Sequence, residues 1–161
     1  HTKYLALARR TRISWHMPVM DTRIEQRVGI RATAEHLWDI LVDFPHWSRW
    51  NTHETEVEGQ LAFGGAFSLT ETWPDMAPRK VEARVTEWQP LAQLIWVEKR
   101  GWLFTTVRYF EIEELDKGSC ILATGMLFQG LRAELFMDRH RKSIRHGLTD
   151  MCDRLKALAE S

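Results

Sequence analysis

The stretch that decides the fold is IRATAEHLWDILVDFPHWSRWN, residues 30–51. Thr33 carries a hydroxyl that can cap a helix, and the apolar side chains after it recur at helical spacing. Pro45 then ends that helix or forces a bend, because its ring removes a helical hydrogen bond and clashes with the preceding turn. We predict a helix over about 34–42 and a second short helix near 46–50.

Extended segments flank the quoted stretch. Before it, Ile24, Val28 and Ile30 alternate with arginines, and this period of two predicts a half-buried strand. After it, strand-like segments follow in series, separated by short turns that contain glycine, proline or aspartate. They span about 52–58, 66–73, 79–88, 93–100, 104–115 and 119–128. Short turns between consecutive strands imply antiparallel pairing, so a parallel doubly wound sheet is not expected.

A single long helix is predicted after Gly130. Apolar side chains from Leu131 to Leu158 fall near one stripe over ~28 residues, or roughly 40 Å at 1.5 Å per residue. A helix of that length needs a broad apolar surface to lie on, and the predicted sheet supplies it. The expected fold class is therefore α+β: an antiparallel sheet of about seven strands wrapped around a long C-terminal helix, with two short helices after the first strand.

The composition is that of a globular domain with balanced charge. The 161 residues include 22 Lys+Arg and 22 Asp+Glu, a net charge of zero that argues against a dedicated nucleic-acid binder. No apolar run reaches the ~18–20 residues that cross a membrane. Cys120 and Cys152 lie far apart in sequence and form no disulfide framework or metal motif, so we expect free thiols in a reducing cytoplasm.

Residues 1–20 differ from the remainder of the chain. They hold four basic side chains and no acidic one, and they show weak periodicity. Their apolar run is too short for the core of a signal peptide, and Met17 or Met20 offers a candidate start. We expect an N-terminal extension over 1–20 that is not part of the fold, followed by one ligand-binding domain over 21–161.

Four local phrases stand in a consistent order along the chain. They are IRATAEHLW at 30–38, DFPHWSRWN at 43–51, a glycine-containing hairpin at 59–67 and VTEWQP at 85–90. Their order and spacing resemble the START-like, or Bet v 1-like (SRPBCC), helix-grip superfamily, specifically its bacterial polyketide cyclase/dehydrase-type members, over roughly residues 22–160. The resemblance implies a ligand cavity between the sheet and the C-terminal helix. Functions in the superfamily are diverse, so the fold alone does not settle the activity.

The implied cavity has a predicted lining, taken from the side chains that share the inward stripe of each strand. Most of this lining is aromatic or aliphatic, with a few polar groups that would orient a ligand. The predicted ligand-binding residues are Trp50, Phe67, Glu71, Trp73, Trp96, Arg108, Phe110, Thr124, Met126, Phe136 and His140.

The polar members of this set have two interpretations. Glu71, Arg108 and also Glu98 lie in register with apolar neighbours, so each either faces the cavity or is turned to solvent by a twist or bulge. If Glu71 and Arg108 both face inward, they are expected to pair with each other or to bind ligand, because isolated buried charge is costly. Such a pair would suit a cyclase-like or dehydratase-like active site, and Arg108 is the first choice for holding an acidic ligand.

Other site chemistry finds no support in the sequence. The seven histidines form no HxH, HxxxH or HExxH spacing, so no metal site is expected. There is no P-loop, dinucleotide fingerprint or nucleophile motif, so no cofactor is expected. The basic run at 139–146 is either a solvated helix face or a contact for anionic lipid or an acidic partner.

Three functions from different classes follow. The leading hypothesis is a non-catalytic carrier or sensor for a small apolar or amphipathic molecule such as a lipid, quinone or polyketide-like compound. The first alternative is a cyclase/dehydratase-type enzyme on a polyketide-like substrate. The second is a protein-interaction module, Hsp90-activator-like or quinone-binding-like. No nucleic-acid partner or transmembrane segment is expected, peripheral membrane contact is compatible with the basic run, and the oligomeric state stays open, a dimer included.

Overall fold

The computed structural model of the chain describes residues 22–161, so the predicted extension over 1–20 lies outside the described residues. Seven antiparallel strands form one sheet in the order β1-β7-β6-β5-β4-β3-β2. The strands are β1 (Arg23–Ile30), β2 (Glu54–Gly59), β3 (Ala66–Glu71), β4 (Arg79–Gln89), β5 (Gln93–Lys99), β6 (Phe104–Asp116) and β7 (Ser119–Gly130). The predicted sheet and its antiparallel pairing are confirmed.

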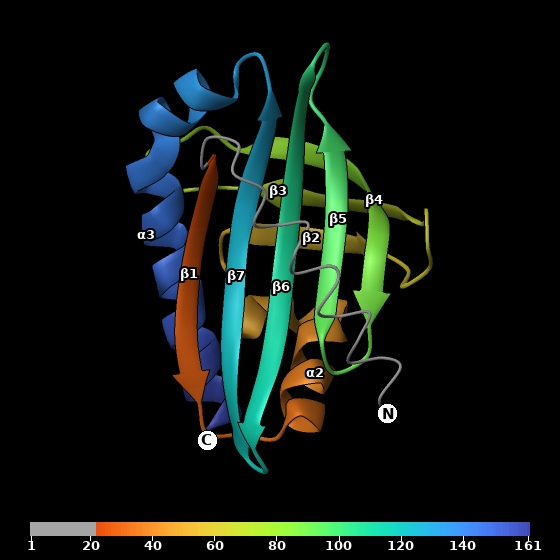
Figure 1. Ribbon diagram of the computed structural model, residues 1–161, viewed down its shortest axis with the longest axis vertical. Helices are drawn as coiled ribbons and strands as arrows, with labels where there is room; N and C mark the ends of the chain where they lie inside the picture. Colours follow the sequence, from red (N-terminus) through yellow and green to blue (C-terminus); the bar gives the residue numbers. More distant parts are fainter. Residues whose placement is uncertain (1–21) are drawn as a thin grey trace.

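The described residues also form three helical elements: α2 (Ala34–Val42), η1 (Phe44–Arg49) and α3 (Ala133–Ala159). Helix α3 packs on β1 and β7, while α2 and η1 lie between β1 and β2 in the chain. Figure 1 shows the curl of the sheet: β1, β7 and β6 run along the long axis beside α3, and β2 and β3 cross behind them. The inner face of the sheet therefore encloses the core together with α3, as the helix-grip prediction required.

Local chemistry explains the turn from β1 into the two short helices. The Thr33 hydroxyl accepts a hydrogen bond from the main-chain N–H of His36 at 3.1 Å, which caps α2 as predicted. Pro45 stands at the start of η1, a 3-10 segment that follows α2 with one residue between. The Trp47 indole N–H then donates to the carbonyl of Leu41 at 2.9 Å, which fixes η1 against α2.

One end of the sheet carries three connections, which we call the loop end: residues 72–78, 100–103 and 131–132. The strand register places the β5–β6 turn beside the end of β7, because Phe104, the first residue of β6, pairs with Gly130, the last of β7. Residues 72–78 lead into Arg79 at the start of β4, and Arg79 binds Glu98 near the end of β5. In Figure 1 the β5–β6 turn and the start of α3 lie at the same end of the long axis. The opposite end holds α2 and the β6–β7 turn.

Candidate functional site

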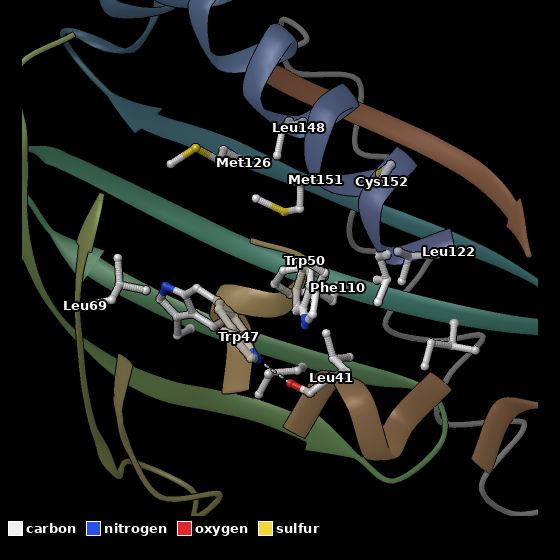
Figure 2. Close-up of a cluster of buried hydrophobic side chains, with 14 of the residues drawn as sticks. Leu41, Trp47, Trp50, Leu69, Phe110, Leu122, Met126, Leu148, Met151 and Cys152 are labelled. Carbon is white, nitrogen blue, oxygen red and sulfur yellow. Dashed lines mark hydrogen bonds between the residues drawn. The ribbon is translucent and has the colours of Figure 1, made fainter. Parts of the chain in front are cut away.

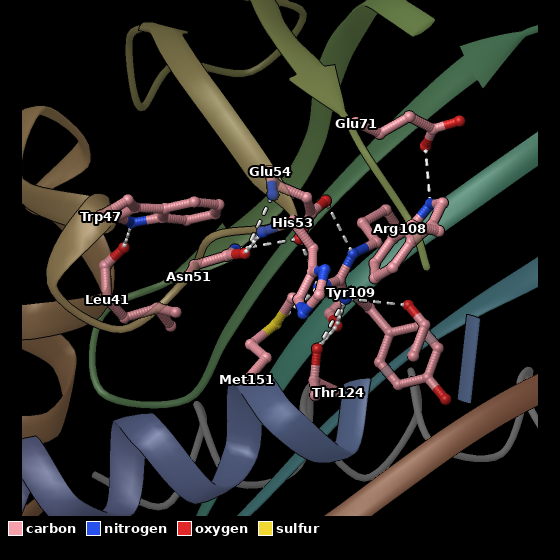
Figure 3. Close-up of polar contacts among 12 residues, drawn as sticks. Leu41, Trp47, Asn51, His53, Glu54, Glu71, Arg108, Tyr109, Thr124 and Met151 are labelled. Carbon is pink, nitrogen blue, oxygen red and sulfur yellow. Dashed lines mark hydrogen bonds and ion pairs between the residues drawn. The ribbon is translucent and has the colours of Figure 1, made fainter. Parts of the chain in front are cut away.

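Arg108 is the central charged side chain of the interior. It projects from β6 toward α3 and is 2% exposed. Its Nε and Nη2 donate to the two carboxylate oxygens of Glu54 at 3.1 and 2.8 Å, and its Nη1 donates to the Thr124 hydroxyl at 2.6 Å (Figure 3). The remaining contacts are the carbonyls of Tyr109 and Gly125 and the sulfur of Met151. A guanidinium has five N–H donors, so Arg108 has none left over for a ligand.

The predicted pair between Glu71 and Arg108 is wrong. Glu71 accepts instead from Arg79 Nε at 2.8 Å and from the Trp73 indole N–H at 3.2 Å. Arg79 extends further and binds Glu98 through two hydrogen bonds of 2.7 Å. The reason is register: Arg79 lies directly opposite Glu71 on the neighbouring strand. Burial opposes the charge of Arg79, yet the hydrogen bonds to Glu98 and Glu71 raise its pKa above the ordinary value.

A small void lies between these two ion-pair groups. Its lining is half polar: Glu54, Leu69, Glu71, Val81, Trp96, Glu98, Thr106, Arg108 and Met126. The void measures about 10 Å³, close to the minimum for a single water molecule. The ligand-sized cavity predicted between sheet and helix is therefore not open at this position.

Aromatic side chains fill most of the space predicted for a ligand. Trp47 lies 5.0 Å from Trp50 and 5.6 Å from Phe110 between ring centroids, and Phe67 lies 4.5 Å from Trp96. Figure 2 shows Trp47, Trp50 and Phe110 gathered below Met151 of α3. The sequence predicted that four of these rings face inward, all but Trp47, but could not tell that they pack against one another rather than around a hollow.

The eleven predicted lining residues fall into three groups. Glu71, Trp96, Arg108 and Met126 line the void; Trp50, Phe67, Phe110 and Thr124 are buried around it. Trp73, Phe136 and His140 lie toward the loop end. There the Trp73 ring stacks on His53 at 5.9 Å, and Phe136 contacts His140 at 4.6 Å on the first turns of α3.

Four buried donors have no hydrogen-bond partner within residues 22–161: the Thr106 hydroxyl, the indole N–H groups of Trp50 and Trp88, and Nη1 of Arg100. Thr106 faces the void, two residues before Arg108 on the same face of β6. We did not single out Thr106, Arg100, Arg79 or Glu54 from the sequence. The period of two that identified Arg108 could have found Thr106, whereas nothing in the sequence marks Glu54 as the partner of Arg108.

Arg100 forms the cationic part of the loop end. Its guanidinium lies 4.5 Å from the ring centroid of Phe136 and 5.2 Å from that of Phe104, and its side chain is 12% exposed. Burial and the neighbouring Arg79 lower the pKa of Arg100. Burial, Arg139 and Arg100 likewise lower the pKa of His140, so this imidazole favours its neutral form. Glu98 lies 3.9 Å from Nε of Arg100, so the guanidinium has a carboxylate at ion-pair distance, whereas its Nη1 has no hydrogen-bond partner among the described residues.

A larger hollow of about 820 Å³ lies on the outer face of the sheet. It is lined by side chains of β2 to β5 that alternate with the inward ones, including Ser68, Glu82, Arg84, Thr86 and Lys99. These polar side chains are mostly solvated, and none of the predicted lining residues apart from Phe67 borders it. We therefore place the candidate site on the inner face.

The sequence matches one family of known proteins. The family model described as polyketide cyclase / dehydrase and lipid transport matches residues 21–160. The chain belongs to this family. The resemblance seen in the four local phrases is thereby confirmed. No curated protein matches the sequence.

Several solved structures are similar to the chain in fold. A hypothetical protein from Helicobacter pylori has a TM-score of 0.72 at 18% identity, covering 91% of this chain and 93% of its own. An aromatase/cyclase from Streptomyces has a TM-score of 0.69 at 13% identity, covering 86% and 93%. Truncated norcoclaurine synthase from Thalictrum flavum has a TM-score of 0.62 at 15% identity, covering 84% and 91%. At such identities the likeness establishes the helix-grip fold.

Two further observations bear on partners. Within residues 22–161, no group of three or more His, Cys, Asp or Glu side chains is arranged to hold a metal ion. No helix in the described part of the chain has the length and apolar character to cross a membrane.

Proposed function

We propose that this chain binds a small amphipathic molecule, such as a lipid, a quinone or a polyketide-like compound, between the inner face of the sheet and α3. One observation carries the proposal: the unpartnered Thr106 hydroxyl at a void within an aromatic interior. A buried polar group without a partner costs free energy, so its retention calls for an explanation. A ligand oxygen that hydrogen-bonds to Thr106 supplies one.

Entry of such a molecule requires movement of side chains. Met126 lines the void and Met151 borders Arg108, and both are flexible thioethers that adapt to irregular spaces. Phe136 at the start of α3 is only half-buried. The ligand would enter from the loop end and push these three side chains aside. Its own apolar surface would then pack against the tryptophans, and burial of that surface contributes roughly 25 cal/mol per Å² to the free energy of binding.

The polar end of the ligand is proposed to meet Thr106 and Arg100 rather than Arg108. Every donor of Arg108 already has a protein partner, and Glu54 balances its charge. Arg100 has a free Nη1 and lies at the loop end. An acidic or carbonyl end group therefore gains a charge-assisted hydrogen bond there, which is stronger than a neutral one.

A matched pair of variants tests the site. Thr105 and Thr106 are neighbours in β6 that face opposite sides of the sheet. We expect a sixteen-carbon fatty acid to change tryptophan fluorescence, and Thr106→Val to weaken its binding by about 12-fold or more, the range of one hydrogen bond to a charged carboxylate. Thr105→Val should bind like wild type. Native mass spectrometry of the purified protein would show a retained ligand directly.

Two results would contradict the proposal. Equal affinities of the Thr105→Val and Thr106→Val proteins would remove Thr106 from the site. Unchanged fluorescence across fatty acids, quinones and aromatic polyketides, with no retained ligand in the mass spectrum, would remove the binding function.

A cyclase-type or dehydratase-type activity is the second candidate, and the carboxylates at the void favour it. Glu71 and Glu98 both border the void and both bind Arg79. A substrate carbonyl at Thr106 would lie near two potential proton acceptors. The test is turnover of a poly-β-keto thioester. Loss of turnover in the Glu98→Gln protein with unchanged ligand affinity would support catalysis. Binding without any turnover by the wild-type protein would support the carrier function only.

A further inference from the structure

The loop end carries a cluster of exposed apolar side chains, which we call the apolar tip: Trp102, Leu103, Leu131 and Leu135. Their exposed fractions are 86%, 50%, 76% and 74%. Such exposure of large apolar side chains is unfavourable in water, and grouped exposure commonly marks a contact surface.

Main-chain contacts hold the two connections of the apolar tip together. The main-chain N–H of Leu131 donates to the carbonyl of Leu103 at 3.1 Å, which joins the β5–β6 turn to the beginning of α3. Leu103 itself has a φ of 57°, in the left-handed region where glycine or asparagine is favoured. A leucine in this conformation strains the backbone, and half of its side chain is exposed, so the fold gives little reason for an apolar residue there.

Positive charge surrounds the tip. Residues 99–103 and 130–142 contain six basic side chains and two acidic ones, although the whole chain has a net charge of zero. Arg132, the N-cap of α3, and Arg139 and Lys142 on α3 are exposed and share a face with Leu135, since residues three, four and seven apart lie on one side of a helix. By the same spacing this face also holds one exposed acidic side chain, Asp138. The exposed surface thus combines apolar side chains with a cationic rim.

We propose that the apolar tip docks on an anionic lipid surface. Trp102 and the three leucines would enter the boundary between headgroups and acyl chains, where tryptophan is enriched, and the basic side chains would meet lipid phosphates. A lipid surface is favoured over a protein partner because the apolar side chains protrude from two short connections and the first turn of α3 and are accompanied by exposed basic side chains. Docking there would place the loop end, with Arg100 and Phe136, at the membrane. The inference stands independently of ligand binding.

Vesicle sedimentation tests the proposal with the full chain. We expect binding to vesicles of phosphatidylcholine with 30% phosphatidylglycerol, little binding to phosphatidylcholine alone, and release in high salt. Trp102→Ser or Leu135→Ser should weaken binding by about 10-fold or more, and Arg139→Gln by about 5-fold. Leu115→Ser is the matched control, because Leu115 is 56% exposed near the β6–β7 turn at the opposite end.

A second readout locates the contact. Brominated phosphatidylcholine in the vesicles should quench Trp102 in the wild-type protein, and Trp102→Phe should still bind while this quenching is lost. The inference is overturned if wild-type protein stays in the supernatant at every lipid composition, if Leu115→Ser weakens binding as much as Trp102→Ser, or if the tip instead captures an acidic protein and ignores vesicles. Thr106→Val should bind vesicles like wild type, which separates this result from the ligand-binding test.

Discussion

The ion pair between Glu54 and Arg108 offers the sharpest test of how the interior is held together. Each side chain is 2% exposed, and the carboxylate accepts two hydrogen bonds from the guanidinium at 3.1 and 2.8 Å. Removing one member leaves the other as a buried charge without compensation. We therefore expect Glu54→Gln and Arg108→Met each to lower the free energy of unfolding by about 3–5 kcal/mol.

The double variant should be much less harmful than the sum of the two changes. Replacing both charges removes the uncompensated charge altogether, and a buried pair exchanged for neutral side chains of similar volume is often tolerated. The Asn51 amide, which donates to Glu54 at 3.2 Å, can keep the glutamine carbonyl as an acceptor. We expect a coupling free energy of at least about 2 kcal/mol between the two positions.

Urea unfolding followed by far-UV circular dichroism measures these differences. With a denaturant dependence of about 2 kcal/mol per molar urea, a loss of 3–5 kcal/mol shifts the midpoint down by about 1.5–2.5 M. Glu58→Gln, an exposed carboxylate on the same strand, is the control and should change stability by less than about 0.5 kcal/mol. Single losses below 1 kcal/mol, or strictly additive losses in the double variant, would refute our account of this pair.

Three further predictions concern α3. Gly147→Ala should lower the free energy of unfolding by about 1–3 kcal/mol, because a Cβ at this position would lie 2.5 Å from the Trp73 ring. The clash outweighs the better helix propensity of alanine. Thermal unfolding measures the difference. Burial raises the pKa of Cys152 to about 12, so this thiol should react with a disulfide reagent at pH 8 only after denaturant is added. Burial disfavours the charged form of Asp150, but its hydrogen bonds, above all the one from His53, hold the pKa of this carboxyl below the ordinary value. Asp150→Asn should therefore lower the melting temperature slightly at pH 7. This difference should be lost as the pH falls below 3.8, because the carboxylate then becomes protonated.

Each of these predictions has a contrary outcome. A stabilised Gly147→Ala protein would mean that Trp73 moves aside at little cost. Rapid modification of Cys152 in native buffer would mean that α3 opens readily from the sheet. A melting-temperature difference for Asp150→Asn that does not shrink as the pH falls below 3.8 would mean that the carboxylate contributes by shape rather than by charge.

Local sequence determined the elements and their order. Thr33 caps α2 and Pro45 begins η1 because capping and ring geometry act over three or four residues. The period of two identified which side chains of β3, β5, β6 and β7 face inward, since alternation follows from the pleat alone. The four phrases between residues 30 and 90 added the family, which the match over residues 21–160 confirmed.

Only the tertiary structure decided which charges meet and how much space remains. Arg108 pairs with Glu54, 54 positions away, while Glu71 is bound by Arg79 across a hairpin. Alternation places Glu71 and Arg108 on the same inner face but says nothing about distance between strands, so the predicted pair failed. The void of about 10 Å³ likewise depends on rings from η1, β3, β5 and β6 packing together. The size of the void and the ion-pair partner of each charged side chain depend on contacts between segments that are distant in sequence. The periodicity of one segment cannot predict such contacts.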